Sequence, residues 1–118
     1  MRRPNRATRR KKTSPDPALQ LLGLATRAGA TVPGTERVKD VVRSGGARLV
    51  LVASDLTATG LDKLVPLLEG RDVPYVVGYT RDELGTAVGR GPLAAVAVTQ
   101  EGFADRLKAL LDPSGDAT

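Results

Sequence analysis

The sequence contains no cysteine and no histidine, and only three of its 118 residues are aromatic: Tyr75, Tyr79 and Phe103. Without cysteine and histidine the chain has no disulfide, no thiolate nucleophile and no imidazole base, and it lacks the usual zinc ligands. We therefore expect no metal and no cofactor. No apolar run approaches the ~18 residues of a membrane span, and the basic start lacks the apolar stretch of a signal peptide. These absences predict a cytoplasmic protein that does not contact membranes.

Positive charge is concentrated at the start of the chain. The net charge is +5, and residues 1–12 hold seven basic side chains and no acid: Arg2, Arg3, Arg6, Arg9, Arg10, Lys11 and Lys12. Such a segment can neutralise phosphates and so bind nucleic acid with strong salt dependence, although a solubilising terminus is the alternative. Residues 1–17 show no apolar periodicity and contain three prolines. We expect a disordered basic tail over 1–17 that contacts RNA phosphates.

The spacing of apolar residues predicts helices that alternate with strands. Helices are expected over 17–28, 35–44, 59–69, 80–88 and 102–111, and strands over 30–32, 48–53, 74–79 and 93–98. The strand at 30–32 is expected at an edge, and those at 48–53 and 74–79 are expected to be buried. This order predicts an α/β fold, a three-layer α-β-α sandwich with a mixed four-stranded sheet, over residues 18–112. Residues 113–118 are expected to be loose.

Several residues carry more specific expectations. Thr35 is expected to be the N-cap of the second helix, and Thr80 begins a capping box with its glutamate three residues later. Gly85 and Gly89 predict close packing and the end of the fourth helix. Leu24 lies among the apolar positions that recur at helical spacing in the first helix.

The order of several motifs resembles one known family. The motifs are a Gly34-Thr35 helix start, Arg43-Ser44-Gly45, a strand that ends at Ser54-Asp55, Leu84-Gly85 followed by Gly89, and the run Ala94–Val98. In this order and at these spacings they resemble the ribosomal protein L7Ae/L30e superfamily, which includes small bacterial members of the YlxQ type. The resemblance covers residues 18–111. It implies an RNA-binding protein and the same α/β sandwich.

The resemblance also implies that the start of the second helix binds RNA. In the family this turn reads Gly-Thr-Asn-Glu-x-x-Lys, and its Asn and Glu hydrogen-bond guanine edges in the sheared G·A pairs of a kink-turn. Aligned without a gap, the chain has Glu36, Arg37 and Asp40 in place of the Asn, the Glu and the Lys. A shift by one residue aligns Thr35, Glu36 and Lys39 instead. The expected RNA-binding residues of this segment are Gly34, Thr35, Glu36, Arg37, Lys39 and Arg43; a helix start that is merely capped and charged is the alternative.

A second contact is implied at the loop before the last strand. There Arg90 is expected near a phosphate, and Pro92 and Leu93 would offer an apolar surface to a flipped-out nucleotide. An ordinary loop that ends at a core strand is the alternative. Asp55 resembles the family's Ala-x-Asp strand end, and a helix cap or turn residue is its preferred interpretation. Its alternative role is to orient a cation of the binding turn.

Together these expectations describe a non-catalytic, monomeric protein that binds a bent or bulged structured RNA such as ribosomal RNA. The ribosome or ribosomal proteins are further candidate partners. The alternative is a ribosome-associated protein-interaction or assembly module without specific RNA readout. The same fold forms the substrate-binding part of RNA ribose methyltransferases, but this chain has no room for their catalytic domain. We therefore do not expect an enzyme.

Overall fold

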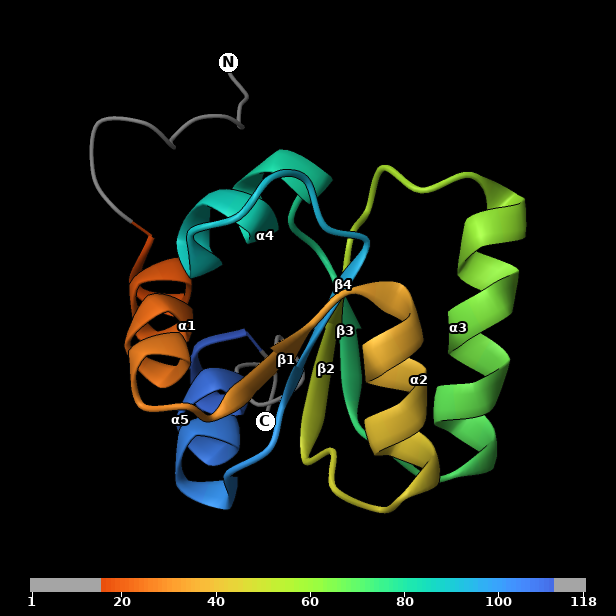
Figure 1. Cartoon of the computed structure of the whole chain (residues 1–118), viewed down its shortest axis with the longest axis horizontal. Helices are drawn as coiled ribbons and strands as arrows, with labels where there is room; N and C mark the ends of the chain where they lie inside the picture. Colours follow the sequence, from red (N-terminus) through yellow and green to blue (C-terminus); the bar gives the residue numbers. More distant parts are fainter. Residues whose placement is uncertain (1–15, 112–118) are drawn as a thin grey trace.

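A computed structural model of the protein describes residues 16–111, which form five helices and a four-stranded sheet (Figure 1). The helices are α1 Pro17–Arg27, α2 Thr35–Arg43, α3 Ala58–Gly70, α4 Arg81–Val88 and α5 Glu101–Leu111. The strands are β1 Thr31–Pro33, β2 Leu49–Val52, β3 Tyr75–Val77 and β4 Ala95–Val98. No helix of this described part is long and apolar enough to cross a membrane. The residues of the expected basic tail, 2–12, lie outside the described residues.

The sheet is mixed, with the strand order β1-β4-β2-β3. Strand β4 pairs antiparallel with both β1 and β2, whereas β2 and β3 run parallel. Every residue of the two central strands is buried, as expected for strands that are covered on both faces. Leu49 lies opposite Val98 and Val52 lies opposite Ala95, so the carboxyl end of β2 meets the start of β4. This end of the sheet also carries the start of α2.

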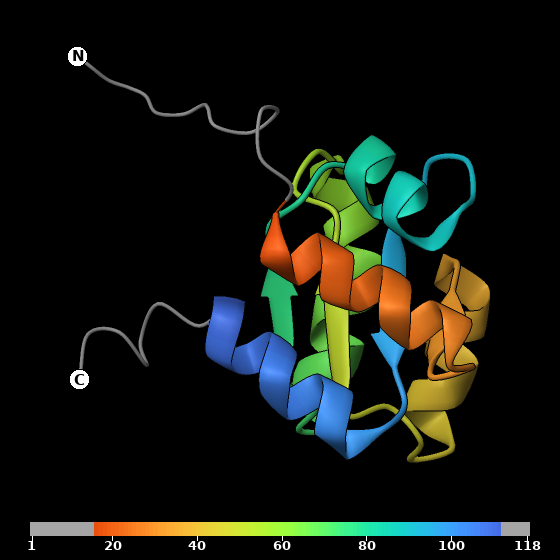
Figure 2. The same cartoon turned by 90° about the vertical axis from the view of Figure 1, so that its left-hand side faces the viewer.

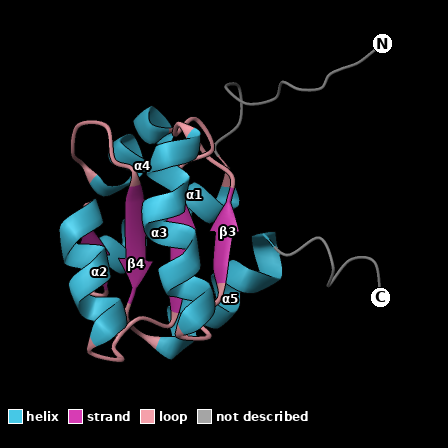
Figure 3. Cartoon of the chain, turned by 90° about the vertical axis from the view of Figure 1, so that its right-hand side faces the viewer, coloured by secondary structure: helices cyan, strands magenta, loops and turns pink. Residues whose placement is uncertain are grey.

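Helices cover both faces of the sheet and make the three-layer sandwich that the sequence predicts (Figures 1 and 3). One core lies between the sheet and α1, α4 and α5, and its buried leucines are Leu21, Leu22, Leu49, Leu51, Leu84 and Leu107. The other core lies between the sheet and α2 and α3, and it contains Val38, Val42, Val50, Val52, Leu64 and Leu68. Leucine, valine and alanine fill both cores, because the chain has few aromatic residues. The predicted fold class is confirmed.

Two sequence expectations about burial are wrong. The strand expected to be buried over 74–79 forms β3, which lies at the edge of the sheet, so none of its residues is fully buried and Val77 is 42% exposed. Leu24 shares the helical spacing of the apolar residues of α1 but is 47% exposed. Helical spacing marks the apolar side of a helix, but it does not show how far the neighbouring elements extend over that side.

Candidate nucleic-acid interface

Helix α2 begins without a side-chain cap. Gly34 is its N-cap residue, with φ 99° and ψ 142°, and no side-chain hydrogen bond caps this end, whereas the N-caps of α1, α3 and α4 each supply a side-chain acceptor. Thr35 is the first helical residue, so the expectation that it is the N-cap is wrong. The reason is that the Gly34 N–H donates to the carbonyl of Ala95, 3.0 Å away, and its left-handed backbone then turns the chain from β1 into the helix.

The uncapped start of α2 suits an anionic ligand. The first amides of a helix have no intrahelical partner, and the helix dipole places partial positive charge at this end. A phosphate or a carbonyl acceptor can bind such amides directly. The nine residues of α2 are held in place by Val38 and Val42, whose side chains are buried against the sheet and α3.

The charged side chains of α2 differ in their exposure. The side chain of Glu36 is 82% exposed, and its carboxylate lies 3.6 Å from the Lys39 ammonium. The Lys39 side chain is only 15% exposed, so its stem lies along the protein surface while its ammonium group reaches Glu36. Arg37 is exposed, and helical geometry places it about 160° around the helix from Lys39. The structure therefore brings Glu36 and Lys39 together and leaves Arg37 on a different side of α2.

Arg43 does not join this turn. It follows Thr35 by eight residues and so lies about 12 Å further along the helix axis. Its guanidinium is 3.8 Å from Asp40, and its backbone carbonyl accepts a 3.1 Å hydrogen bond from Arg71. Arg43 thus belongs to the far end of α2, away from the first turn.

The loop between α4 and β4 lies beside the start of α2. Gly34 donates its hydrogen bond to Ala95, the first residue of β4, directly after the loop, and Figure 1 shows the loop descending to β4 where α2 begins. Arg90 and Pro92 are exposed, whereas Leu93 is half-buried and packs against the core under α1, α4 and α5. The two predicted contact segments therefore share one end of the sheet, although Leu93 offers less free surface than the sequence suggests.

Two glycines allow this loop to fold back on α4. Gly89 ends the helix with φ 77°, and the Arg90 N–H donates to the carbonyl of Gly85 at 2.7 Å. A Cβ at Gly85 would lie 2.0 Å from the carbonyl oxygen of Gly91, so only glycine fits there. The predicted C-cap at Gly89 and the predicted close packing at Gly85 are confirmed, and the partner of Gly85 is the following loop.

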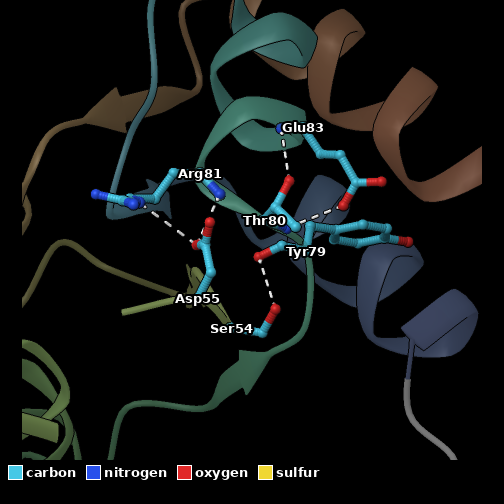
Figure 4. Close-up of polar contacts among 6 residues, drawn as sticks. All are labelled: Ser54, Asp55, Tyr79, Thr80, Arg81 and Glu83. Carbon is cyan, nitrogen blue, oxygen red and sulfur yellow. Dashed lines mark hydrogen bonds and ion pairs between the residues drawn. The ribbon is translucent and has the colours of Figure 1, made fainter. Parts of the chain in front are cut away.

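Asp55 links the end of β2 to the start of α4 (Figure 4). Its carboxylate accepts the backbone N–H of Arg81 at 3.0 Å and lies 3.5 Å from the Arg81 Nε. The carbonyl of Arg81 in turn accepts the N–H of Leu93 at 3.1 Å. The preferred interpretation of Asp55 as a helix-capping residue agrees with these contacts, and the carboxylate pairs with Arg81 instead of a cation of α2.

Sequence reasoning missed Arg81 as a residue that positions the loop. The only local signal in the sequence was the capping box of Thr80 and Glu83, and the structure contains it. Thr80 Oγ1 accepts the Glu83 N–H at 3.1 Å, and the Glu83 carboxylate accepts the Thr80 N–H at 2.9 Å. That pattern identifies a helix start. The partner of Arg81 lies 26 residues earlier, and local spacing gives no sign of it.

Charge elsewhere in the described part is balanced. Residues 16–111 contain eleven basic and eleven acidic side chains, so this part is neutral and the excess positive charge of the chain lies in residues 1–12.

On the side of α3, the Tyr75 hydroxyl donates a 2.7 Å hydrogen bond to Glu69. This bond, with some desolvation and the negative charge of Glu69, raises the pKa of Tyr75 above its usual 10.0.

Comparisons with known proteins give consistent results. The model of the ribosomal protein L7Ae/L30e/S12e/Gadd45 family matches residues 16–108. The RNA-binding protein YlxQ of Bacillus subtilis (strain 168) is 38% identical over 92 residues, which cover 78% of this chain and 92% of that protein.

Two solved structures resemble the fold. A protein of unknown function from Bacillus halodurans C has a TM-score of 0.79 and 34% identity, over 83% of this chain and 99% of that one. A 15.5 kD RNA-binding protein from Giardia lamblia has a TM-score of 0.65 and 24% identity, over 78% of this chain and 85% of that one. The second likeness concerns the fold alone.

Proposed function

The chain belongs to the ribosomal protein L7Ae/L30e/S12e/Gadd45 family, and from this premise we propose that it is a non-catalytic protein that binds structured RNA. The main support for this proposal is the uncapped start of α2, which lies beside an exposed loop at one end of the sheet. The name of the similar Bacillus subtilis protein, an RNA-binding protein, supports the same class of ligand. The proposed target is a bent or bulged RNA of the kink-turn type, such as ribosomal RNA.

The turn at the start of α2 would read the RNA. The N–H groups after Gly34 can donate hydrogen bonds to a phosphate or to a base acceptor. The exposed Glu36 carboxylate can accept hydrogen bonds from guanine N1 and N2. Lys39, 3.6 Å from Glu36, would hold that carboxylate and face the RNA backbone. These contacts favour the alignment in which Glu36 and Lys39 take the places of the family's Glu and Lys, with Thr35 in place of the Asn.

The loop and the far end of α2 would add further contacts. Arg90 can reach a phosphate, and Pro92 with the exposed part of Leu93 can support an unstacked base. Arg37 and Arg43 lie on other parts of α2 and would contact the RNA backbone as it passes the helix. A bent RNA suits this arrangement, because the turn and the loop meet at one end of the molecule.

The basic residues of segment 2–12 would add affinity that does not depend on sequence. Each phosphate contact contributes about 0.7–0.9 to the slope of log affinity against log salt, so seven contacts would give a slope of roughly −5 to −6. We further propose that the protein acts as a monomer in the cytoplasm, on or near the ribosome.

Binding of the full-length protein to a kink-turn RNA and to a straight duplex of equal length tests this function. We expect tighter binding to the kink-turn, and the difference should persist at high salt because base and shape contacts are less salt-dependent than phosphate contacts. Equal affinity for both RNAs at every salt concentration would show that the protein does not read a bend.

A protein-interaction module is the second candidate, because the family's Asn is absent from the turn in both alignments. A full-length variant with the seven basic residues of 2–12 replaced by serine separates the two. If all RNA affinity is lost, the basic segment alone bound RNA and the module is favoured. If preference for the kink-turn remains, the domain reads the RNA.

A further inference from the structure

An open groove of about 1400 Å³ lies on the side of the sheet that α1, α4 and α5 cover. It is lined by the outward side of α1, by α4, by the end of β3 and by Leu111 of α5. Figure 2 shows the start of α1, β3 and the end of α5 on the same side of the molecule. The groove shares no lining residue with the proposed RNA-binding turn or loop.

The floor of the groove is more apolar than a solvated surface requires. Leu24 of α1 lines it and is 47% exposed, and the half-buried Val76 lines it from β3, with its side chain on the same side of the sheet as α1, α4 and α5. Val76 belongs to an edge strand. The Gly78 N–H donates to β2 and the Pro74 carbonyl accepts from β2. Because the backbone groups of successive strand residues point alternately to the two sides, the N–H and carbonyl groups of Tyr75 and Val77 point to the open edge of the sheet. An extended segment could pair with these groups and cover the apolar floor.

The charge of the groove is negative. Asp16, Asp82 and Glu83 line it against one cation, Arg27. Within residues 16–111 none of these four side chains takes part in an ion pair. Asp82 and Glu83 are exposed, whereas Asp16 is half-buried and accepts a 2.9 Å hydrogen bond from the Tyr79 hydroxyl. Carboxylates beside an apolar floor attract a basic partner and repel RNA phosphates. They also disfavour a second copy of the same groove, because like charges would then face each other.

We propose that this groove binds an extended basic peptide segment of a partner protein that shares the RNA target. Proteins on one RNA carry basic segments, because they must neutralise its phosphates. This partner assignment rests on the proposed function; the peptide-binding groove itself does not. The protein would then hold RNA at the α2 end of the sheet and a basic protein segment at the β3 edge.

The test measures binding of a fluorescent twelve-residue peptide, in which valine alternates with lysine and arginine, to the full-length protein. A second peptide has serine in place of valine and the same charge. The variant Asp82→Asn/Glu83→Gln removes two charges and keeps an acceptor for the capping box. Glu101→Gln/Asp105→Asn on α5 is the matched control, because it removes two exposed charges outside the groove.

We expect the valine peptide to bind at least roughly tenfold more tightly than the serine peptide, since it buries apolar surface. The groove variant should weaken binding by about threefold to tenfold and the control by less than about twofold. Amide NMR shifts should map to α1, α4 and β3. Equal binding of both peptides, equal loss in both variants, or shifts at α2 would overturn the groove as a peptide site.

Two further measurements distinguish a failure of the peptide site from a failure of RNA binding. Kink-turn affinity is measured on the same variants, and we expect the groove substitutions to leave it unchanged. If the peptide binds the groove but no RNA binds the protein, the proposed function fails and the RNA-sharing partner is also wrong, while the peptide site remains. If the peptide binds only the variant with serine in place of the seven basic residues of 2–12, the chain's own basic segment takes the groove and the partner proposal is overturned.

Discussion

Replacing Gly85 by alanine should destabilise the protein by displacing the loop between α4 and β4. A Cβ at residue 85 would lie 2.0 Å from the carbonyl oxygen of Gly91 and 2.9 Å from that of Arg90. Both oxygens belong to the backbone, so no side-chain rotation relieves the clash. Carbon–oxygen contacts in proteins are about 3.3 Å or longer, and the loop would therefore have to retreat by roughly 1 Å.

The size of the effect follows from the contacts that the retreat breaks. The Arg90 N–H donates to Gly85 at 2.7 Å, and the Leu93 N–H donates to Arg81 at 3.1 Å. Each backbone bond contributes about 1 kcal/mol, and the forced overpacking adds about 1–3 kcal/mol. Alanine regains about 1 kcal/mol of helix propensity. We expect a net loss of about 2–4 kcal/mol in the free energy of unfolding, which lowers Tm by roughly 10 °C or more.

Urea unfolding of the full-length protein, followed by circular dichroism, measures this loss. Hydrogen exchange of the Arg90 and Leu93 amides reports the loop directly, and both amides should exchange faster in the variant. Gly102→Ala on α5 is the control: a Cβ there meets nothing within 4 Å, so stability should rise by up to about 1 kcal/mol. A Gly85→Ala protein with the wild-type urea midpoint and unchanged exchange would refute the close packing described above.

Three further predictions concern other residues. Gly34→Ala should lower the free energy of unfolding by about 1–3 kcal/mol in urea titrations, because φ 99° strains any residue with a side chain. Asp55→Ala should cost about 1–2 kcal/mol by thermal unfolding, and Asp55→Asn should cost less because its amide oxygen can still accept the hydrogen bond at the start of α4. Absorbance titration at alkaline pH should show Tyr75 ionising above pH 10.0, and Glu69→Ala should move its pKa back toward that value. Because the raised pKa belongs to the folded state, its stabilising contribution is present below pH 10.0 and is lost as pH rises through the raised pKa.

Local sequence patterns predicted most of the secondary structure. The Thr80–Glu83 capping box marks the start of α4 in the sequence and in the structure, and Gly89 ends that helix as expected. Such signals work because both partners lie within one turn of each other. The exposure of β3 could not be predicted in this way, since it depends on which strand lies at the edge of the sheet.

The arrangement of the candidate site was less accessible to sequence reasoning. Thr35 is the expected N-cap by residue type, but a hydrogen bond to Ala95, 61 residues later, makes Gly34 the cap. The contact of Asp55 with Arg81 spans 26 residues and likewise leaves no local pattern. The resemblance to a known family supplied the candidate residues, and the fold accounts for how the α2 turn and the loop meet.

A matched pair of full-length double variants tests whether the first turn of α2 reads bent RNA. Glu36→Ala/Arg37→Ala removes an adjacent acid and base from that turn, and Asp62→Ala/Lys63→Ala removes the same pair from exposed positions on α3. The ratio of kink-turn to straight-duplex affinity is measured for both by fluorescence anisotropy. We predict that the α2 variant loses about tenfold to a hundredfold of this ratio, since base contacts contribute about 1–3 kcal/mol, while the α3 variant keeps it. An unchanged ratio in a folded α2 variant would show that this turn does not read the RNA.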